Sequence, residues 1–325
     1  MKEKKYPYSL LQCIVLAFLL PFSLYAQIDK KESASSDKHN SRINKCNQEW
    51  DFLALVSKTP ADVIELFQKA GMHPEEHKLT LKEQAIVTEA FSKLPPLHKK
   101  ILKEHLKSIS FLDNMPNTAL TSTLNPDDEF KTFHIAFRAG ILHQTASEWL
   151  TEKERKTFIY DDSSYSITME GGDLPAFLYV LIHEGTHVVD GSLGLLADKK
   201  QNTKPDSSAF SFTKGVWQER TVFTKAINDS LFLKNGFRRG GEATSVKNAV
   251  KLYTLLKTTP LLSLYSSSSW HEDLAEYITV YHLTQRLKQP FRIVVHKDGK
   301  KVFRYDPMTN KSVLNRKGIA SIFYS

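Results

Sequence analysis

The chain has 325 residues, of which 41% are hydrophobic and 25% are charged, so it can bury a substantial core as one large domain or two ordinary ones. The net charge is +8, but the basic residues are spread along the chain in short clusters and no nucleic-acid-binding motif accompanies them. Composition therefore argues against nucleic acid as a partner, and it carries no signal for an oligomeric state.

The first 26 residues have the pattern of a secretory signal peptide. Lys2, Lys4 and Lys5 precede an apolar run from Leu10 to Phe22, and Ala26 offers a cleavage site. The apolar run is shorter than the roughly 20 residues of a membrane-spanning helix, so we expect membrane attachment only if this segment stays uncleaved. The sequence thus predicts an exported protein, either periplasmic or secreted.

Residues 27–46 are polar and nearly free of large apolar side chains, which is typical of a flexible spacer. Cleavage after Ala26 would remove Cys13 and leave Cys46 as the one remaining cysteine. An exported chain with one thiol has no internal disulfide, so its stability is expected to come from packing.

Residues 47–130 are predicted to form a mainly helical N-terminal region. A Thr-Pro pair at residues 59–60 fits a helix start, and Gly71 fits the end of that helix. Thr80 can cap a second helix that runs to about Lys93.

Apolar residues recur at helical spacing over residues 97–109, after two prolines, and predict a third helix. His73 and His77 stand four apart in the same region, but Pro74 directly follows the first of them. We interpret this segment as a solvated turn between two helices and not as a metal site.

Beyond this region the pattern changes, because aromatic and β-branched residues begin to alternate with polar ones. Residues 131–140 and 156–169 are predicted as strands, separated by a short helix at residues 145–155. Asp173 and Pro175 then fit the start of a longer helix, with a capping residue followed by a proline near the first turn.

That longer helix contains LIHEGTHVVDG (residues 181–191), which includes an H-E-x-x-H motif. On a helix, His183 and His187 project from one face with β-carbons roughly 5–6 Å apart, so both imidazoles can reach one ion. Glu184 would lie beside that ion without binding it, where it can act on a water molecule that the ion has acidified. The alternative is an ordinary helix whose two histidines are satisfied by neighbouring groups.

A zinc site needs a further ligand, and the downstream sequence offers candidates. The metzincin continuation is absent, since Asp190 stands where its glycine would be. Residues 266–283 instead predict a second helix with Glu272 and Glu276 four apart on one face. Either carboxylate could be the ligand, and His271 could also reach the metal from its position about 100° round the helix.

These motifs together resemble the gluzincin metallopeptidases, in particular the branch typified by the catalytic domain of anthrax lethal factor. In that branch the H-E-x-x-H helix continues with an aspartate, matched by Asp190, and a later E-x-x-A-E helix is matched by residues 272–276. A tyrosine precedes the first glutamate of that helix by two turns, and Tyr265 stands seven residues before Glu272. The similarity covers about residues 157–290.

The resemblance implies which residues bind the metal and which one moves the proton. It makes His183, His187 and Glu272 the zinc ligands. It makes Glu184 the general base, which takes a proton from water and later passes it to the leaving amine.

The resemblance also implies roles for residues around the ligands. Tyr265 would donate a hydrogen bond to the oxyanion, with a plain surface aromatic as the alternative. Glu276 would support a zinc-bound histidine from behind. Asp190 would either orient His187 through its second ring nitrogen or begin a turn at Gly191.

The predicted fold class is α+β, with a zincin-like metallopeptidase domain at residues 131–325 that has a small sheet and an active-site helix. Residues 291–305 fit a β-hairpin with an Asp-Gly turn, and residues 315–325 fit a last strand. The predicted function is an exported zinc-dependent peptidase with a peptide or protein substrate. The alternative is a secreted, non-catalytic zinc-binding or interaction protein on the same scaffold.

Overall fold

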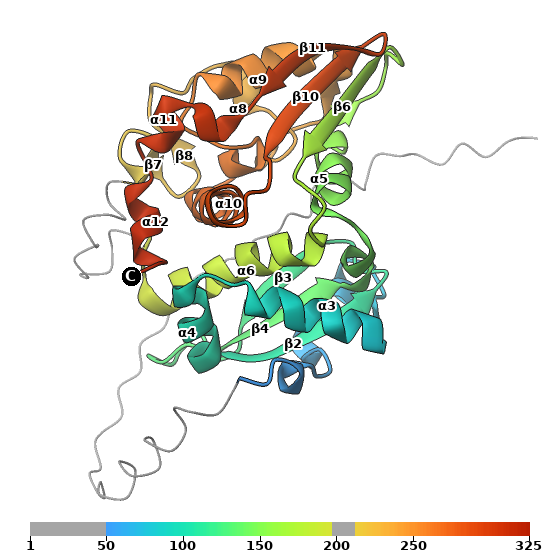
Figure 1. Ribbon diagram of the computed structural model, residues 1–325, viewed down its shortest axis with the longest axis vertical. Coiled ribbons are helices and arrows are strands. Elements are labelled where there is room, and N and C mark those ends of the chain that lie inside the picture. The colour runs from blue at the N-terminus through green and yellow to red at the C-terminus, as the bar shows by residue number, and fades with distance from the viewer. Residues whose placement is uncertain (1–49, 197–211) are drawn as a thin grey trace, which may run out of the picture.

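A computed structural model describes residues 50–196 and 212–325 (Figure 1). Within these ranges the chain combines helices with small sheets, which confirms the α+β class. The predicted signal peptide at residues 1–26 and the predicted spacer at residues 27–46 lie outside the described residues. No helix in the described part of the chain is both long and apolar enough to cross a membrane.

Helices and short strands are interspersed along the described residues. The α-helices are α2 (Ala61–Lys69), α3 (Leu81–Ser92), α4 (Pro96–His105), α5 (Ala146–Arg155), α6 (Ala176–Leu193), α8 (Ser230–Leu233), α9 (Ala249–Lys257), α10 (Trp270–Tyr281), α11 (Lys311–Leu314) and α12 (Gly318–Ile322). Short 3-10 helices lie at Leu53–Leu55, Ala139–His143, Val246–Asn248, Tyr265–Ser267 and Pro307–Thr309, and a π-helical segment at His282–Arg286 follows α10. The strands are β1 (Glu75–Glu76), β2 (Leu106–Asp113), β3 (Ala119–Thr123), β4 (Phe133–Arg138), β5 (Phe158–Ile159), β6 (Tyr165–Glu170), β7 (Trp217–Glu219), β8 (Val222–Phe223), β9 (Thr244–Ser245), β10 (Arg292–Lys297) and β11 (Lys300–Tyr305).

One sheet has the strand order β1-β2-β4-β3, in which β2 and β4 run parallel. Both faces of this central pair are largely buried because helices cover both of them. Phe177 of α6 packs against Phe111 and Phe137 on one face, and Phe67 of α2 belongs to the apolar cluster on the other. Strand β3 forms one edge of the sheet, beside α6.

The prediction that residues 47–130 are mainly helical is wrong for residues 106–113 and 119–123, which form β2 and β3. The third helix ends at His105, and the chain continues directly into β2. A short apolar run fits both periodicities, and here pairing with β4 decides in favour of a strand. Because β4 lies between β2 and β3, this sheet joins residues on both sides of position 130.

Two other local predictions for this region are confirmed, whereas the predicted solvated turn at residues 73–77 contains the paired strand β1. Helix α2 begins after Pro60, and Gly71 follows its end with a positive φ of 75°. The side chain of Thr80 accepts the backbone N–H of Glu83, whose carboxylate in turn accepts the backbone N–H of Thr80. This reciprocal cap fixes the start of α3.

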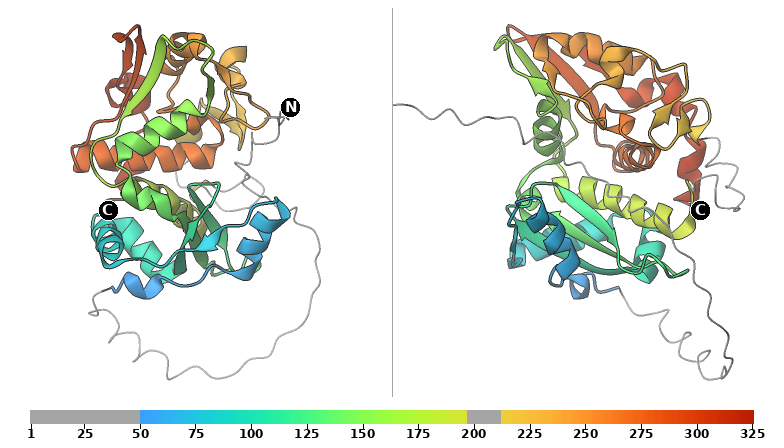
Figure 2. Two further views of the ribbon diagram at one scale, coloured as in Figure 1. Left: turned by 90° about the vertical axis from the view of Figure 1, so that its right-hand side faces the viewer. Right: turned by 180° about the vertical axis from the view of Figure 1, so that it is seen from behind.

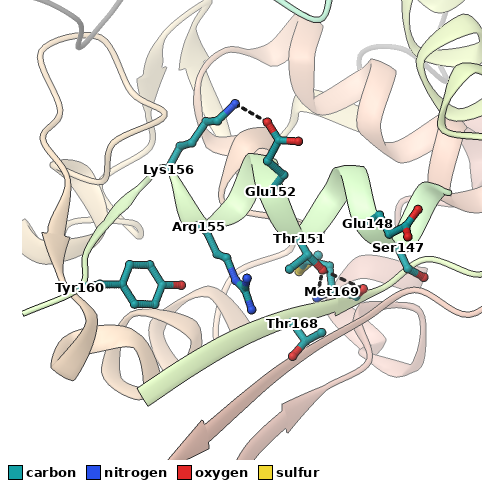
Figure 3. A pocket seen from close by; sticks show the side chains of 9 residues that line it. All are labelled: Ser147, Glu148, Thr151, Glu152, Arg155, Lys156, Tyr160, Thr168 and Met169. Atoms are coloured by element: carbon teal, nitrogen blue, oxygen red, sulfur yellow. Dashed lines mark hydrogen bonds and ion pairs between the residues drawn. The ribbon is translucent and has the colours of Figure 1, made fainter. Parts of the chain in front are cut away.

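A second sheet has the order β11-β10-β6 and contains the predicted hairpin of β10 and β11. Side chains of α5 cap the open edge of β6 (Figure 3): Thr151 Oγ1 accepts the N–H of Met169, and Arg155 Nε donates to the carbonyl of Ile167. Ser147 Oγ accepts the N–H of Gly171 just beyond the strand. A helix thereby satisfies backbone groups that would otherwise expose a pairing edge.

Helices α6 and α10 cross between the two sheets (Figures 1 and 2). Residues 176–183 of α6 are all buried, as expected for a helix that is covered on every side. The predicted last strand at residues 315–325 is wrong, because residues 318–322 form α12. Ile319, Ala320 and Phe323 share one buried face there, which is a helical spacing.

His134 is fully buried in strand β4, where its two ring nitrogens lie 2.7 Å from Ser108 Oγ and 3.0 Å from Ser110 Oγ. Burial lowers the pKa of His134 from its ordinary 6.5 to about 4. Burial also lowers the pKa of His98 to about 3 and that of His282 to about 4. These imidazoles are therefore neutral in the folded chain at neutral pH.

We expect the free energy of unfolding to decrease as the pH falls, because the unfolded chain takes up a proton at His134 more readily than the folded chain does. The unfolded chain takes up a proton near pH 6.5 and the folded chain only near pH 4, so stability present above pH 6.5 is lost between these values. The free-energy advantage of the wild type over His134→Gln should shrink by about 2 kcal/mol between pH 6.5 and 5. Urea unfolding at each pH measures this free-energy difference. The control is His73→Asn, at an exposed position, for which the difference from the wild type should not change with pH. A constant difference across this pH range would contradict the assignment.

Candidate metal centre

The crossing of α6 and α10 brings the predicted ligands together. His183 and His187 lie one turn apart on α6, and Glu272 lies in the first turn of α10. Ser269 caps α10, since its side chain accepts the backbone N–H of Glu272. The cap therefore fixes the first turn of α10, which contains the glutamate whose side chain faces α6.

The donor atoms of these three residues converge on one point. Nε2 of His183 lies 2.9 Å and Nε2 of His187 lies 3.5 Å from Oε2 of Glu272. One ligand atom from each residue lies within 4.8 Å of the others, and among the described residues this is the group able to hold a metal ion. Two imidazole nitrogens and one carboxylate oxygen form a donor set of the kind that would hold a zinc ion.

Glu276 lies behind this group and is already occupied by hydroxyl groups. Tyr179 donates to its Oε1 at 3.0 Å, and Ser263 donates to its Oε2 at 2.7 Å. Oε1 also lies 3.4 Å from Nδ1 of His183, an electrostatic contact outside hydrogen-bond geometry. Glu276 is thus placed to support His183, and Glu272 is the carboxylate placed to bind the ion.

The charged groups of the site shift one another's pKa values. Burial lowers the pKa of His183, but Glu272 and Glu276 outweigh it and raise the pKa to about 9. Burial raises the pKa of Glu276, but Lys153 and His183 outweigh it and lower the pKa to about 2. Burial also raises the pKa of Glu272, but His187 and His183 outweigh it and hold the pKa well below its usual value. Both glutamates are therefore anionic at neutral pH, and their burial calls for positive charge nearby.

Glu184 points from α6 towards the edge of the four-stranded sheet. Its Oε2 accepts a hydrogen bond of 2.6 Å from the hydroxyl of Thr121 in β3. The contact joins residues 63 positions apart, and the sequence around Thr121 has no pattern that would predict it. One oxygen of the Glu184 carboxylate is thus held by β3, while the residue itself lies between the two histidines in α6.

Tyr265 lies at the site, which supports its predicted position. Its ring centroid is 5.7 Å from that of His183, and the residue is half-buried. The serines that follow it, Ser266 and Ser267, are fully buried, and Asn235 Nδ2 donates to Ser267 Oγ at 3.0 Å. The serine run is therefore a packed segment that holds the tyrosine in place.

The structure places Asp190 differently from both sequence interpretations. Its Oδ2 lies 2.5 Å from Nδ1 of His271, and its Oδ1 accepts the backbone N–H of Leu196. Asp190 therefore links α6 to α10 instead of contacting His187, and α6 continues past Gly191 to end before Gly194. His271 contacts this carboxylate and stands outside the metal-binding group.

Comparisons with known proteins found no similarity: no family model matches the chain, and no curated protein or solved structure matches it. The function must therefore be inferred from the residues of the site.

We predict that the purified chain binds one zinc ion. Glu272→Ala should lose most of this zinc, because the number of protein ligands falls from three to two. Glu276→Gln should retain the ion with an affinity roughly 10–100-fold lower, since only a supporting contact changes. Elemental analysis after gel filtration and competition with a chromogenic chelator measure both. Full zinc content in Glu272→Ala together with loss in Glu276→Gln would exchange the two roles.

Proposed function

We propose that this chain is an exported zinc-dependent metallopeptidase of the gluzincin type, with a zincin-like catalytic domain and a peptide or protein as substrate. The observation that carries the proposal is the convergence of His183, His187 and Glu272 from two crossing helices, with Glu184 beside them. The expected export to the periplasm or the medium rests on the residue pattern of positions 1–26.

The residues around the ligands have the chemistry that peptide hydrolysis requires. A zinc ion held there would supply Lewis acidity, which polarises a carbonyl group and makes a water molecule more acidic. Glu184 follows His183 directly and would accept the proton from the attacking water and then pass it to the leaving amine. Thr121 would hold one oxygen of Glu184 throughout, at the 2.6 Å contact.

Tyr265 is proposed as the donor to the oxyanion that develops on the substrate carbonyl. Burial, with the nearby carboxylates of Glu272 and Glu184, raises the pKa of its phenol well above the usual value. The phenol therefore keeps its proton at neutral pH, as a hydrogen-bond donor must.

The ligand set favours an enzyme over a structural zinc site. Structural zinc is held by four protein ligands in nearly all cases, whereas the described residues bring three to this point. His187 and Glu272 also keep 21% and 16% of their side chains exposed, so the ligands are reachable from solvent. A non-catalytic binding protein would need neither this access nor a carboxylate at position 184.

We predict that Glu184→Gln abolishes hydrolysis, by roughly 10²–10⁴-fold, while the zinc content stays at one ion per chain. The amide keeps the shape of the side chain but cannot accept the proton from water. Digestion of a broad peptide library with detection by mass spectrometry measures cleavage, and the exposed Glu89→Gln is the matched control. Wild-type cleavage by zinc-loaded Glu184→Gln would remove Glu184 from the mechanism.

Tyr265→Phe should lower kcat by about 10²-fold, the usual effect of deleting one oxyanion donor, and leave KM nearly unchanged. The ring remains in place, so zinc content and thermal stability should equal those of the wild type. Steady-state kinetics on a peptide found in the library digestion provide the measurement. An unchanged kcat would show that the phenol does not contact the reacting carbonyl.

A further inference from the structure

Lys153 reaches the metal centre from α5, a helix that carries none of the motifs described above. Its Nζ lies 3.4 Å from the centroid of the Tyr265 ring and 3.7 Å from Oε1 of Glu276. The Trp149 ring centroid is 5.1 Å away, and 17% of the Lys153 side chain is exposed. An ammonium group thus lies between the proposed oxyanion donor and the carboxylate behind His183.

Such burial requires a reason, because a desolvated ammonium group is unfavourable unless it is matched. Here the match is specific: a carboxylate on one side and aromatic faces on the other, which attract a cation through their electron-rich surfaces. Lys156, the C-cap residue of the same helix, shows the ordinary arrangement. Its side chain is 63% exposed and pairs with Glu152 at 2.8 Å.

Two other rings also contact the Tyr265 ring. Phe237 meets the ring edge-on at 5.3 Å between centroids, and His183 lies at 5.7 Å. The ammonium group lies nearer, with Nζ 3.4 Å from the ring centroid. Glu276 in turn fixes the ammonium group, since Tyr179 and Ser263 hold its carboxylate.

We propose that Lys153 is a positioning residue of the metal centre, which holds the Tyr265 ring in the orientation needed to donate to the oxyanion. Glu276 keeps the ammonium group in place, so that one carboxylate orders both a metal-binding histidine and the proposed donor. This role rests on the proposed peptidase function, but the contact with Tyr265 can be judged without any substrate.

The first experiment is ¹⁹F NMR of the zinc-loaded chain labelled with 3-fluorotyrosine, with the Tyr265 resonance assigned through Tyr265→Phe. Lys153→Met removes the charge and keeps the length of the side chain, so the Tyr265 resonance should shift and broaden. Lys153→Arg keeps a cation that stacks on aromatic rings and should restore a narrow resonance. The matched control Lys156→Met should leave the resonance unchanged.

The second experiment is a double-mutant cycle on kcat. Lys153→Met should lower kcat at least tenfold with little change in KM in the wild type, and should have no further effect in the Tyr265→Phe background. Equal losses of kcat in both backgrounds, or a Tyr265 resonance that ignores Lys153→Met, would overturn the proposal. If Lys153→Met does not fold, Lys153→Gln takes its place under the same expectations.

The two proposals can fail separately. Absence of cleavage by the zinc-loaded wild type would end the peptidase proposal, and the ¹⁹F spectra would still decide whether Lys153 orders Tyr265. Cleavage by the wild type, with normal kcat in a folded, zinc-loaded Lys153→Met, would end the role of Lys153 alone.

Discussion

The pairing of buried negative charge with buried positive charge, where α10 crosses α6, is the constraint on which the site depends. Glu276 of α10 is fully buried, and Glu272, one turn earlier on the same face, keeps 16% of its side chain exposed. An unmatched carboxylate there would destabilise the fold by several kcal/mol. His183 and Lys153 lie against these carboxylates, and a bound cation would complete the match. The same carboxylates would therefore bind the metal ion and help to pack the two helices together.

Much of the site could be predicted from the sequence because helix geometry is local. Spacings of four residues put the two histidines of α6 on one face and the two glutamates of α10 on another, whatever the rest of the chain does. Thr121 and Lys153 could not be predicted in this way. Their contacts depend on where β3 and α5 pack in the fold, and the sequence near either residue does not indicate that packing. Asp190 illustrates the same limit, since its partner His271 lies 81 positions away.

The secondary structure shows the same contrast between elements set by local contacts, which could be predicted, and elements set by distant contacts, which could not. Helix α3 was predictable because its cap involves Thr80 and Glu83, three residues apart, and the β10–β11 hairpin because its turn is an Asp-Gly pair. Residues 106–113 and 318–322 were assigned wrongly since short apolar runs fit both a helix and a strand. In the first case the neighbouring strand β4 settles the conformation, a contact that no window of the sequence contains.

Helix α5 has two working faces. Ser147, Thr151 and Arg155 bond the edge of β6 and its continuation, while Trp149 and Lys153 face Tyr179 and Tyr265. One inserted or deleted residue in this helix would turn everything beyond it by about 100°, and so would disturb both faces at once. The number of residues between Trp149 and Arg155 is therefore constrained by both faces together.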